Sequence, residues 1–362
     1  TWCNNQTGGQ RIWRKIDWAF VNGKWLDALE FSECEVLPAG ISDHSPLVVS
    51  ISRASYIGKV PFKFFNAWCT HSDFLPTVER EWQHDCQGSP MARVWFKLKL
   101  LKPKLKELNK VFFSDIQQKI EDYKLMLASL QSSMIHDPFN QTLQDEERSI
   151  YQHLRNLIYA EESIVRQKSR IRWIQMGDSN TSYFHKSVKQ RRARNRIISI
   201  ENPNGEIVED PTVVKEAIVR YYKDLLGTPT SHRTSIQKRI MDTGPKLKVD
   251  DRDMLNAPVT EQEVRSAIFS INGDKAPGPD GYNSCFFQKC WHIIGREVTA
   301  AVQHFFSSGQ FYNPINATAI TLVPKVHNPH SLGDYRPIAC CTVLYKCITK
   351  IITCRLRRVV SY

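Results

Sequence analysis

Two basic residues late in the chain have the types and the spacing to hold a polyphosphate. Lys325 ends the apolar run ITLVPK, and Arg336 stands in the run YRPIAC, with VHNPHSLGD between the two runs. A hairpin would bring both cations to one face, where Arg offers a planar fork of donors and Lys a point charge. The alternative, that Arg336 pairs only with Asp334, is left open by the pattern.

A histidine with two nearby carboxylates is the second candidate site. His44 and Asp43 lie in GISDHSPL, which leads into a predicted strand, and Asp17 lies upstream in KIDWAFV. A histidine that moves a proton at a phosphate needs a carboxylate on its second ring nitrogen, and a neighbouring Asp can hold a metal-bound water. We expect strand-borne Asp17 to be within reach of His44. Ser-Asp before a strand is also a common turn, so a purely structural reading stays open.

Net charge favours a polyanionic partner, with nucleic acid as the first candidate. The 362 residues contain 49 Lys and Arg against 37 Asp and Glu, a formal charge of +12. The excess is concentrated in two windows: Met91–Lys110 has seven basic residues and one acidic residue, and Glu161–Ile200 has ten and three. A solvated helix surface explains the first window about as well as a binding face does.

The second window interleaves cations with aromatic residues, in QKSRIRWIQMGDSNTSYFHKSVKQRRARNRI. Single-stranded nucleic acid is bound in this way, because bases stack on rings while phosphates meet cations. Equally, the aromatic residues could belong to a core. The candidate nucleic-acid-binding residues are Lys168, Arg170, Arg172, Trp173, Lys189, Arg191, Arg192, Arg194 and Arg196.

Hydrophobic periodicity predicts both strands and helices around these residues. Strands are expected at IDWAFV, SECEVLP and SPLVVSI with a turn at NGKW, in a hairpin at IISIENPNGEIVED, and at ITLVPK and YRPIAC. Helices are expected at Trp95–Met134 with Pro103 as a kink or a start, at Leu143–Val165, at 211–226, at 260–272 with a Thr260 to Glu263 capping box, at Phe286–Phe306 and at TVLYKCITKIITCRL. The break HDPFN makes the first two helices an antiparallel hairpin. DKAPGPDGYN is expected to form a rigid loop.

Cysteine usage and the start of the sequence predict an intracellular protein, nuclear or cytoplasmic. Ten cysteines without a CxxC pair suit neither a disulfide framework nor a zinc knuckle, so we expect reduced and mostly buried thiols. The opening TWCNNQTGGQ is not a signal peptide, and no run approaches the ~20 apolar residues of a membrane span. Both ends have the character of cut ends, and exposed apolar surface at an unfinished β edge predicts poor solubility.

The early motifs TW, KIDWAFVN and SDHSPL, in this order, resemble the C-terminal end of the endonuclease/exonuclease/phosphatase fold, particularly its apurinic-endonuclease-like members. The resemblance implies that His44 is the catalytic histidine, that Asp17 orients it, and that Asp43 is a metal-site or proton-transfer residue. The Asn, the Glu and the Asp-x-Asn pair of that family have no counterpart in this chain.

The later motifs KAPGPDGYN, LVPKV and DYRPIAC closely resemble the start of reverse transcriptase in non-LTR retrotransposons (LINE, L1-like), including those abundant in plants. VRQKSRIRWIQMGDSNTSYFH resembles the family's preceding segment, differing at Val165 and Tyr183. The resemblance implies that Lys325 and Arg336 contact the triphosphate of an incoming nucleotide, and that the Pro277–Gly281 loop lies near the template. The palm aspartates of the family, which bind the two metals of nucleotidyl transfer, match no stretch of this sequence.

Together the resemblances predict an α+β protein in three parts: residues 1–53, the terminal strands of an endonuclease/exonuclease/phosphatase-like sandwich; residues 54–254, a basic connector with a long helical hairpin; and residues 255–362, partial reverse transcriptase fingers. The expected function is that of a fragment of an RNA-directed DNA polymerase and endonuclease, inactive alone. Mg²⁺ is expected for the intact family, without a complete metal site here. The expected partners are RNA, DNA and a deoxynucleoside triphosphate, with no membrane and no inferable protein partner. The alternative is a non-specific nucleic-acid-binding protein that uses the basic connector.

Overall fold

The computed structural model of the chain describes residues 1–29, 32–51, 61–169, 188, 191, 195, 197–201, 205–227, 235–244, 246–326 and 329–360. It contains helices and small antiparallel sheets, in agreement with the predicted α+β class. The chain forms two compact units: unit 1 is drawn from Thr1–Val60 and Trp173–Ile197, and unit 2 from Pro61–Arg172 and Ile198–Tyr362. These units group residues by their contacts and do not define domain boundaries along the sequence. The boundaries expected after residues 53 and 254 therefore stay predictions.

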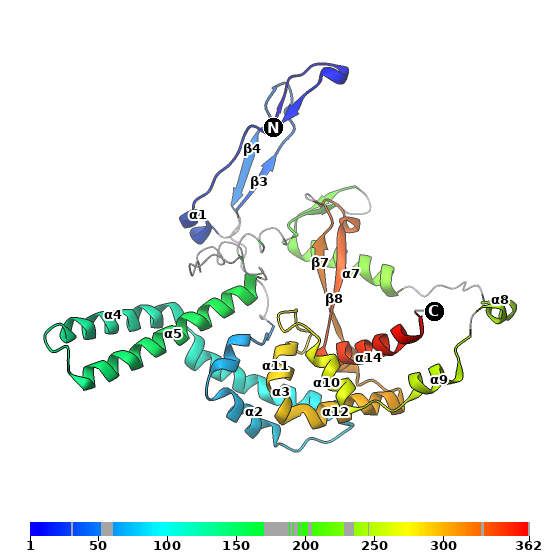
Figure 1. Cartoon of the computed structure of the whole chain (residues 1–362). Helices are drawn as coiled ribbons and strands as arrows, with labels where there is room; N and C mark the ends of the chain where they lie inside the picture. Colours follow the sequence, from blue (N-terminus) through cyan, green and yellow to red (C-terminus); the bar gives the residue numbers. More distant parts are fainter. Residues whose placement is uncertain are drawn as a thin grey trace. The chain divides into compact units, whose positions relative to one another are not determined.

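Unit 1 has two small antiparallel ribbons, drawn in blue in Figure 1. β1 (Trp2–Cys3) pairs with β2 (Trp13–Arg14), and β3 (Ser32–Val36) pairs with β4 (Leu47–Ile51). A short 3-10 turn, Gly8–Gln10, lies between β1 and β2. The strands predicted at SECEVLP and SPLVVSI are therefore confirmed.

The strand expected at IDWAFV and the turn expected at NGKW are wrong. Residues 15–22 have no regular secondary structure, and the helix α1 (Gly23–Ala28) begins at the predicted turn. The Asn22 side chain accepts a hydrogen bond from the Trp25 backbone N–H at 2.8 Å, so it caps this helix. Residues 16–21 pair with no other strand among the described residues, so their alternating apolar pattern forms no ladder.

Unit 1 buries little apolar surface. Among the hydrophobic side chains that the structure describes there, Cys3 alone is buried, whereas Phe20 is 89% exposed and Trp13 is 61% exposed. The β3–β4 ribbon also exposes Val48 and Val49. The apolar exposure predicted for this β edge is present in the described residues.

Unit 2 has one hydrophobic core to which distant stretches of the sequence contribute. Phe64, Trp68 and Leu98 pack there with Tyr282 and Phe286. The elements around this core are η2 (Asn66–Thr70), α2 (Phe74–Trp82), α3 (Pro90–Leu108), α10 (Glu261–Phe269), α11 (Ser284–Lys289), α12 (Trp291–Ser308), α13 (Asn313–Asn316) and α14 (Val343–Val360). The basic stretch after residue 61 therefore folds together with the late motifs of the chain.

The long helix expected from Trp95 is confirmed with a different start and an interruption. α3 begins at Pro90, because the Ser89 side chain accepts a hydrogen bond from the Ala92 N–H at 3.3 Å. Pro103 lies inside α3 and does not start it. A π-helical segment, Asn109–Phe113, then separates α3 from the next helix.

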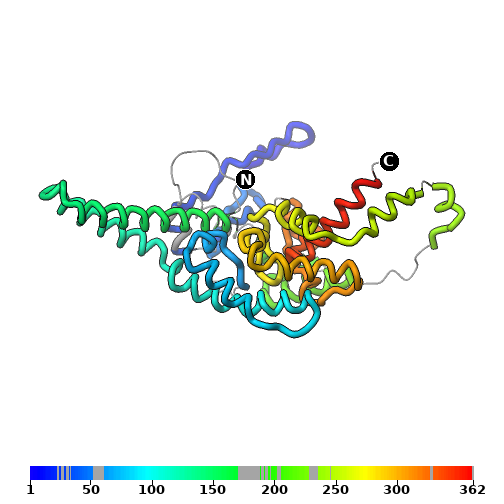
Figure 2. The backbone as a smooth tube through the Cα atoms, turned by 60° about the horizontal axis from the view of Figure 1, so that its bottom comes forward, coloured from blue at the N-terminus to red at the C-terminus, as the bar shows by residue number. Residues whose placement is uncertain are grey.

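The predicted helical hairpin is confirmed. α4 (Ile116–Met134) and α5 (Gln141–Ser169) lie side by side in both Figure 1 and Figure 2. The Asn140 side chain accepts a hydrogen bond from the Thr142 N–H at 3.0 Å, so the predicted break at HDPFN also starts α5. Ile120, Ile150 and Leu154 are buried along the hairpin.

The hairpin predicted at IISIENPNGEIVED is present as β5 (Ile200–Glu201) paired with β6 (Ile207–Val208). It is followed by α7 (Pro211–Gly227), which was predicted, and by α8 (Lys238–Thr243) and α9 (Val249–Asn256). The Glu201 N–H donates to the His330 carbonyl at 2.9 Å, which attaches this hairpin to the loop before the last strand.

The late strands form a ribbon, as predicted. β7 (Thr318–Pro324) pairs with β8 (Tyr335–Cys341), from Thr318 opposite Cys341 to Pro324 opposite Tyr335. A 3-10 turn, Leu332–Asp334, precedes β8. The single helix expected at Phe286–Phe306 is instead two helices, α11 and α12, because the backbone leaves helical geometry at Cys290.

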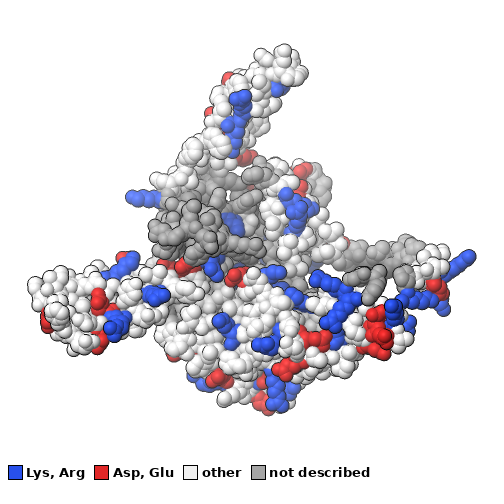
Figure 3. All heavy atoms as spheres, viewed as in Figure 1, with Lys and Arg blue, Asp and Glu red and all other residues white. Residues whose placement is uncertain are grey.

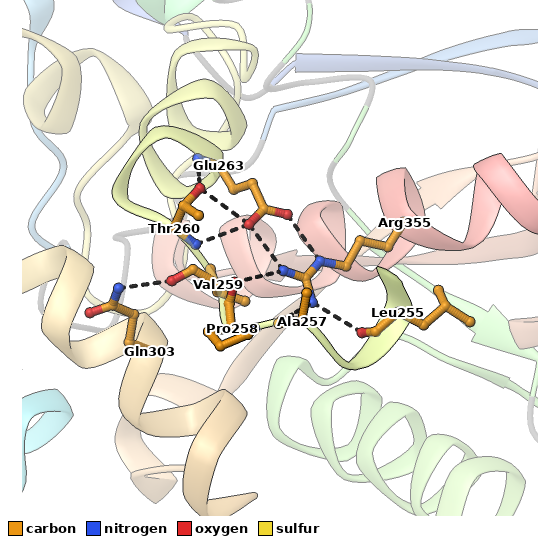
Figure 4. Close-up of polar contacts among 8 residues, drawn as sticks. All are labelled: Leu255, Ala257, Pro258, Val259, Thr260, Glu263, Gln303 and Arg355. Atoms are coloured by element: carbon orange, nitrogen blue, oxygen red, sulfur yellow. Dashed lines mark hydrogen bonds and ion pairs between the residues drawn. The ribbon is translucent and has the colours of Figure 1, made fainter. Parts of the chain in front are cut away.

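α10 and α14 are joined by a buried arginine, shown in Figure 4. The predicted capping box starts α10: the Glu263 N–H donates to Thr260 Oγ1 at 3.2 Å, and the Thr260 N–H donates to Glu263 Oε2 at 2.9 Å. Arg355 of α14 donates to both Glu263 carboxylate oxygens at 3.0 Å. Its guanidinium also donates to the carbonyls of Leu255, at 3.0 Å, and Ala257, at 2.6 Å. The pKa of Glu263 is lowered, and its hydrogen bonds with Arg355 are the largest cause, as expected for a bidentate pair.

Candidate functional site

His44 and Asp17 lie in contact in unit 1. His44 Nδ1 is 3.0 Å from Asp17 Oδ2, although Asp17 stands in an irregular segment and not on a strand. The Asp17 N–H donates to Thr1 Oγ1 at 2.8 Å, and His44 forms an isolated antiparallel bridge with Trp2. The beginning of the sequence therefore holds both residues in place.

Electrostatics suit this pair to a proton-transfer role. The Thr1 hydroxyl and then His44 lower the pKa of Asp17, which keeps its carboxylate ionised at neutral pH. A carboxylate on Nδ1 fixes the ring tautomer and leaves Nε2 free to accept a proton. The side chain of His44 is 47% exposed, so a solvent-borne phosphodiester could approach it.

Asp43, the third candidate of unit 1, makes a structural contact. Its Oδ2 accepts a hydrogen bond from Trp2 Nε1 at 3.1 Å, and its carbonyl accepts one from the Cys3 N–H at 2.8 Å. In the part of the chain that the structure describes, no three His, Cys, Asp or Glu side chains are grouped to hold a metal ion. Asp43 is accordingly not part of a ligand set among those residues.

Lys325 and Arg336 lie on one face of the β7–β8 ribbon. Arg336 is the cross-strand partner of Val323, and Lys325 stands two residues after Val323. Cross-strand partners and residues two apart point to the same face of a sheet, so both cations project from that face. The Lys325 N–H continues the ladder to the Asp334 carbonyl at 2.7 Å. Both side chains are exposed, and the same face exposes Val323 and Ile338.

The alternative in which Arg336 pairs with Asp334 is not observed. The Asp334 carboxylate accepts hydrogen bonds from Ser331 N–H at 2.9 Å, Ser331 Oγ at 3.0 Å and His330 N–H at 3.1 Å. The Ser331 backbone N–H is the main cause that lowers the pKa of Asp334. Among the described residues Arg336 has no ion-pair partner, whereas Lys325 Nζ donates to the Gly333 carbonyl at 2.6 Å. Arg336 is therefore the more available of the two for a ligand.

The loop DKAPGPDGYN, predicted to be rigid, is built into the core of unit 2. Gly281 has φ +81°, and a Cβ there would overlap the Phe62 carbonyl, so glycine is required. The Phe64 N–H donates to the Gly281 carbonyl at 2.9 Å, and the Tyr282 hydroxyl donates to the Leu98 carbonyl at 2.8 Å. The loop thus connects the segment before η2 with α3.

Asp280 in this loop is a buried carboxylate to which the sequence assigned no role. The residue is 2% exposed, and its Oδ1 atom has no hydrogen-bond partner among the described residues. Burial raises the pKa of Asp280 to about 6, although the Tyr282 backbone N–H, then Lys102 of α3 and Lys346 of α14, oppose the shift. Residue type and spacing carried no signal for this burial, because the neighbours come from three distant segments.

Most of the basic connector site lies outside the described residues. Of the nine candidates only Lys168 and Arg191 are described, and Lys168 Nζ lies 5.4 Å from the centre of the Phe65 ring. Arg170, Arg172, Trp173, Lys189, Arg192, Arg194 and Arg196 lie outside the described residues. On the face drawn in Figure 3, Lys and Arg side chains gather over α14, and Asp and Glu gather over α9.

Two further expectations concern the state of the cysteines and the presence of a membrane-spanning helix. All ten cysteines are free, as expected, but only Cys3, Cys290 and Cys347 are buried, so the prediction of mostly buried thiols is wrong. No helix among the described residues combines the length and the apolar composition needed to cross a bilayer.

Fold and sites together define a mixed helical and β protein with exposed cations on a ribbon and a separate histidine–aspartate pair. No family model matches the chain. The chain is similar to the uncharacterized 149 kDa protein of transposon TX1 from Xenopus laevis, with 22% identity over 353 residues. The match covers 96% of this chain and 27% of that protein, so the chain spans about a quarter of its relative's length.

Proposed function

We propose that this chain is part of a non-LTR retrotransposon polyprotein, in which unit 2 carries the fingers of an RNA-directed DNA polymerase. The observation that carries the proposal is the pair of exposed cations, Lys325 and Arg336, on one face of the β7–β8 ribbon. They stand in LVPKV and DYRPIAC, the two motifs that resemble reverse transcriptase. The similarity to a transposon protein along 96% of the chain supports the retrotransposon origin.

The ribbon suits the triphosphate of an incoming nucleotide. An arginine fork binds two phosphate oxygens at once, and a nearby lysine adds a point charge. Diagonal cross-strand neighbours such as these lie about 7–8 Å apart at Cα, which is within reach of adjacent phosphates for long side chains. Val323 and Ile338 offer an apolar surface beside the cations.

Catalysis is not assigned to these residues alone. Mg²⁺ is expected for the intact family, but the described residues offer no ligand set that fits it, so no metal-dependent step is derived. The palm aspartate motifs also match no stretch of the 362 residues. A polypeptide of this sequence is expected to incorporate no nucleotide on a primed template.

His44 and Asp17 support an endonuclease-like origin for unit 1. A histidine oriented by a carboxylate at 3.0 Å can act as a general base or acid at a phosphodiester. In the proposed polyprotein this pair would complete a site whose other residues belong to the preceding part of the endonuclease. RNA and DNA are accordingly the proposed partners of the whole assembly.

The test is calorimetric binding of deoxythymidine triphosphate to the full chain. We expect weak binding that Lys325→Gln/Arg336→Gln weakens at least about tenfold, since two charge-assisted contacts are lost. The matched control is Lys289→Gln/Arg296→Gln, which removes the same charge from exposed positions of α11 and α12. The control is expected to bind as the wild type does. Equal losses in both variants, or none in either, would refute the assignment.

A further inference from the structure

α3 has a basic stripe that the proposed function does not use. Trp95, Lys99, Lys102 and Lys106 are spaced by four, three and four residues, so they follow one side of the helix. This basic stripe runs directly beside the buried stripe that includes Leu98, Leu101 and Leu105. The arrangement accounts for the half-buried positions of Trp95 and Lys102.

The lysines of the stripe differ from the other lysines of α3 in their partners. Lys97 is paired with Glu297 at 2.7 Å, and Lys104 with Glu107 at 3.5 Å. Among the described residues Lys99, Lys102 and Lys106 have no ion-pair partner within 4.0 Å. Like charges at these spacings destabilise a helix slightly, so an external anion would relieve their repulsion.

Aromatic rings accompany the cations of the stripe. Lys102 Nζ lies 5.6 Å from the centre of the Phe62 ring and 5.9 Å from that of Trp95. Both rings are partly buried at the edge of the core, which holds them in fixed positions. Fixed aromatic rings next to unpaired cations are the combination that binds single-stranded nucleic acid, since bases stack and phosphates meet charge.

A fully solvated surface, the simpler explanation for this basic window, does not fit Lys102. Burial is the main cause that lowers the pKa of Lys102, and Lys106 and Lys99 lower it further. The charge of the buried Asp280 opposes this lowering of the Lys102 pKa, so Lys102 is coupled to the loop that carries Asp280. Lys102 is therefore a half-buried cation, and Lys99 and Lys106 are exposed on the same side of α3.

We infer that the basic stripe of α3, together with Phe62, binds the backbone and bases of a single-stranded polynucleotide. The inference rests on the proposed function only in taking the partner to be a nucleic acid. It assigns the contact to Lys99, Lys102 and Lys106, outside the residues already named for nucleic-acid binding. Because Lys102 also interacts electrostatically with Asp280, the test leaves it unchanged.

The experiment measures fluorescence anisotropy of a labelled oligo(U) strand with the full chain, over a range of salt concentrations. For Lys99→Gln/Lys106→Gln the slope of log K against log[salt] is expected to become shallower by about 1.4, because each lost phosphate contact on a single strand removes about 0.7. At 0.1 M salt the same two contacts amount to about a 25-fold loss of affinity.

The matched control is Arg93→Gln/Lys104→Gln, which removes the same charge from the opposite side of α3. It is expected to keep the wild-type slope and affinity to within about twofold. Both variants change exposed side chains, and circular dichroism checks that the helix content is the same.

The outcomes separate this inference from the proposed function. If the wild type binds no oligonucleotide but still binds deoxythymidine triphosphate, the inference fails and the proposed function stands; if it binds neither, both fail. If it binds the oligonucleotide and the two variants lose affinity equally, or neither loses any, the stripe is not the site and only the inference fails. Equal dependence on the stripe for a duplex of the same length would overturn the assignment to a single strand.

Discussion

Replacing the buried Asp280 with asparagine is expected to change how the unfolding free energy of unit 2 depends on pH. Burial raises the pKa of Asp280 to about 6 in the folded chain, against an ordinary value of 3.8. Between these values the folded state holds a proton that the unfolded state has lost. The contribution of Asp280 to stability is therefore fully present below about pH 4 and is lost as pH rises through about 6.

The magnitude follows from the two pKa values. The difference of about two units amounts to about 3 kcal/mol over the whole range. Between pH 5 and pH 7, where most other carboxylates are already ionised in both states, the expected loss is about 1.3 kcal/mol. The Tyr282 backbone N–H, Lys102 and Lys346 oppose the rise in the pKa of Asp280, and their effect is already contained in the value of about 6.

The assay compares the wild type with Asp280→Asn in urea unfolding at pH 5 and at pH 7, followed by tryptophan fluorescence. Trp68 and Trp82 are buried in unit 2 and report on its core. Because asparagine does not titrate, the wild type is expected to lose about 1.3 kcal/mol relative to the variant between the two pH values. A difference that stays constant, or one that grows in favour of the wild type as pH rises, would refute the reasoning.

Two further substitutions test how unit 2 is held together. Arg355→Ala is expected to lower the unfolding free energy by about 3 kcal/mol, because removing the buried guanidinium leaves the Glu263 carboxylate and several carbonyls without their donor. A loss below about 1 kcal/mol in urea unfolding would contradict this expectation. Tyr282→Phe removes only the hydroxyl that donates to the Leu98 carbonyl, so we expect a loss of about 1 kcal/mol by the same method. An unchanged urea midpoint for Tyr282→Phe would show that this buried contact is not formed in solution.

Local patterns in the sequence predicted many of the elements correctly. The helical period before and after HDPFN predicted the α4–α5 hairpin, and short apolar runs separated by polar residues predicted β7 and β8. The capping box at Thr260 also fixed the start of α10. These features depend on neighbours within a few residues, which is the range that sequence patterns describe.

Long-range packing could not be predicted in the same way. The alternating residues of IDWAFV resemble a strand, but Asn22 caps a helix just after them and no partner strand pairs with them among the described residues. The contact between the segment at Phe64 and the loop at Gly281 joins positions far apart in the chain. For the same reason the burial of Asp280 could not be predicted.

The candidate sites also differ in whether local sequence patterns were sufficient to predict them. The spacing of Lys325 and Arg336 around a hairpin was sufficient to expect them on one face, and the register places them there. The contact of His44 with Asp17 was also expected, although the strand thought to carry Asp17 is absent from residues 15–22. The basic stripe of α3 needed the structure, because only partner contacts distinguish it from a solvated face.

The central claim is that these residues belong to a non-LTR retrotransposon polyprotein. The most direct measurement is the sequence of the transcript that encodes them, extended on both sides of this reading frame. We expect, in the same frame, an endonuclease Asn and Glu upstream and, downstream, an aspartate-bearing strand followed by a YxDD turn. An uninterrupted frame whose flanking segments encode neither an endonuclease nor a polymerase palm would contradict the claim.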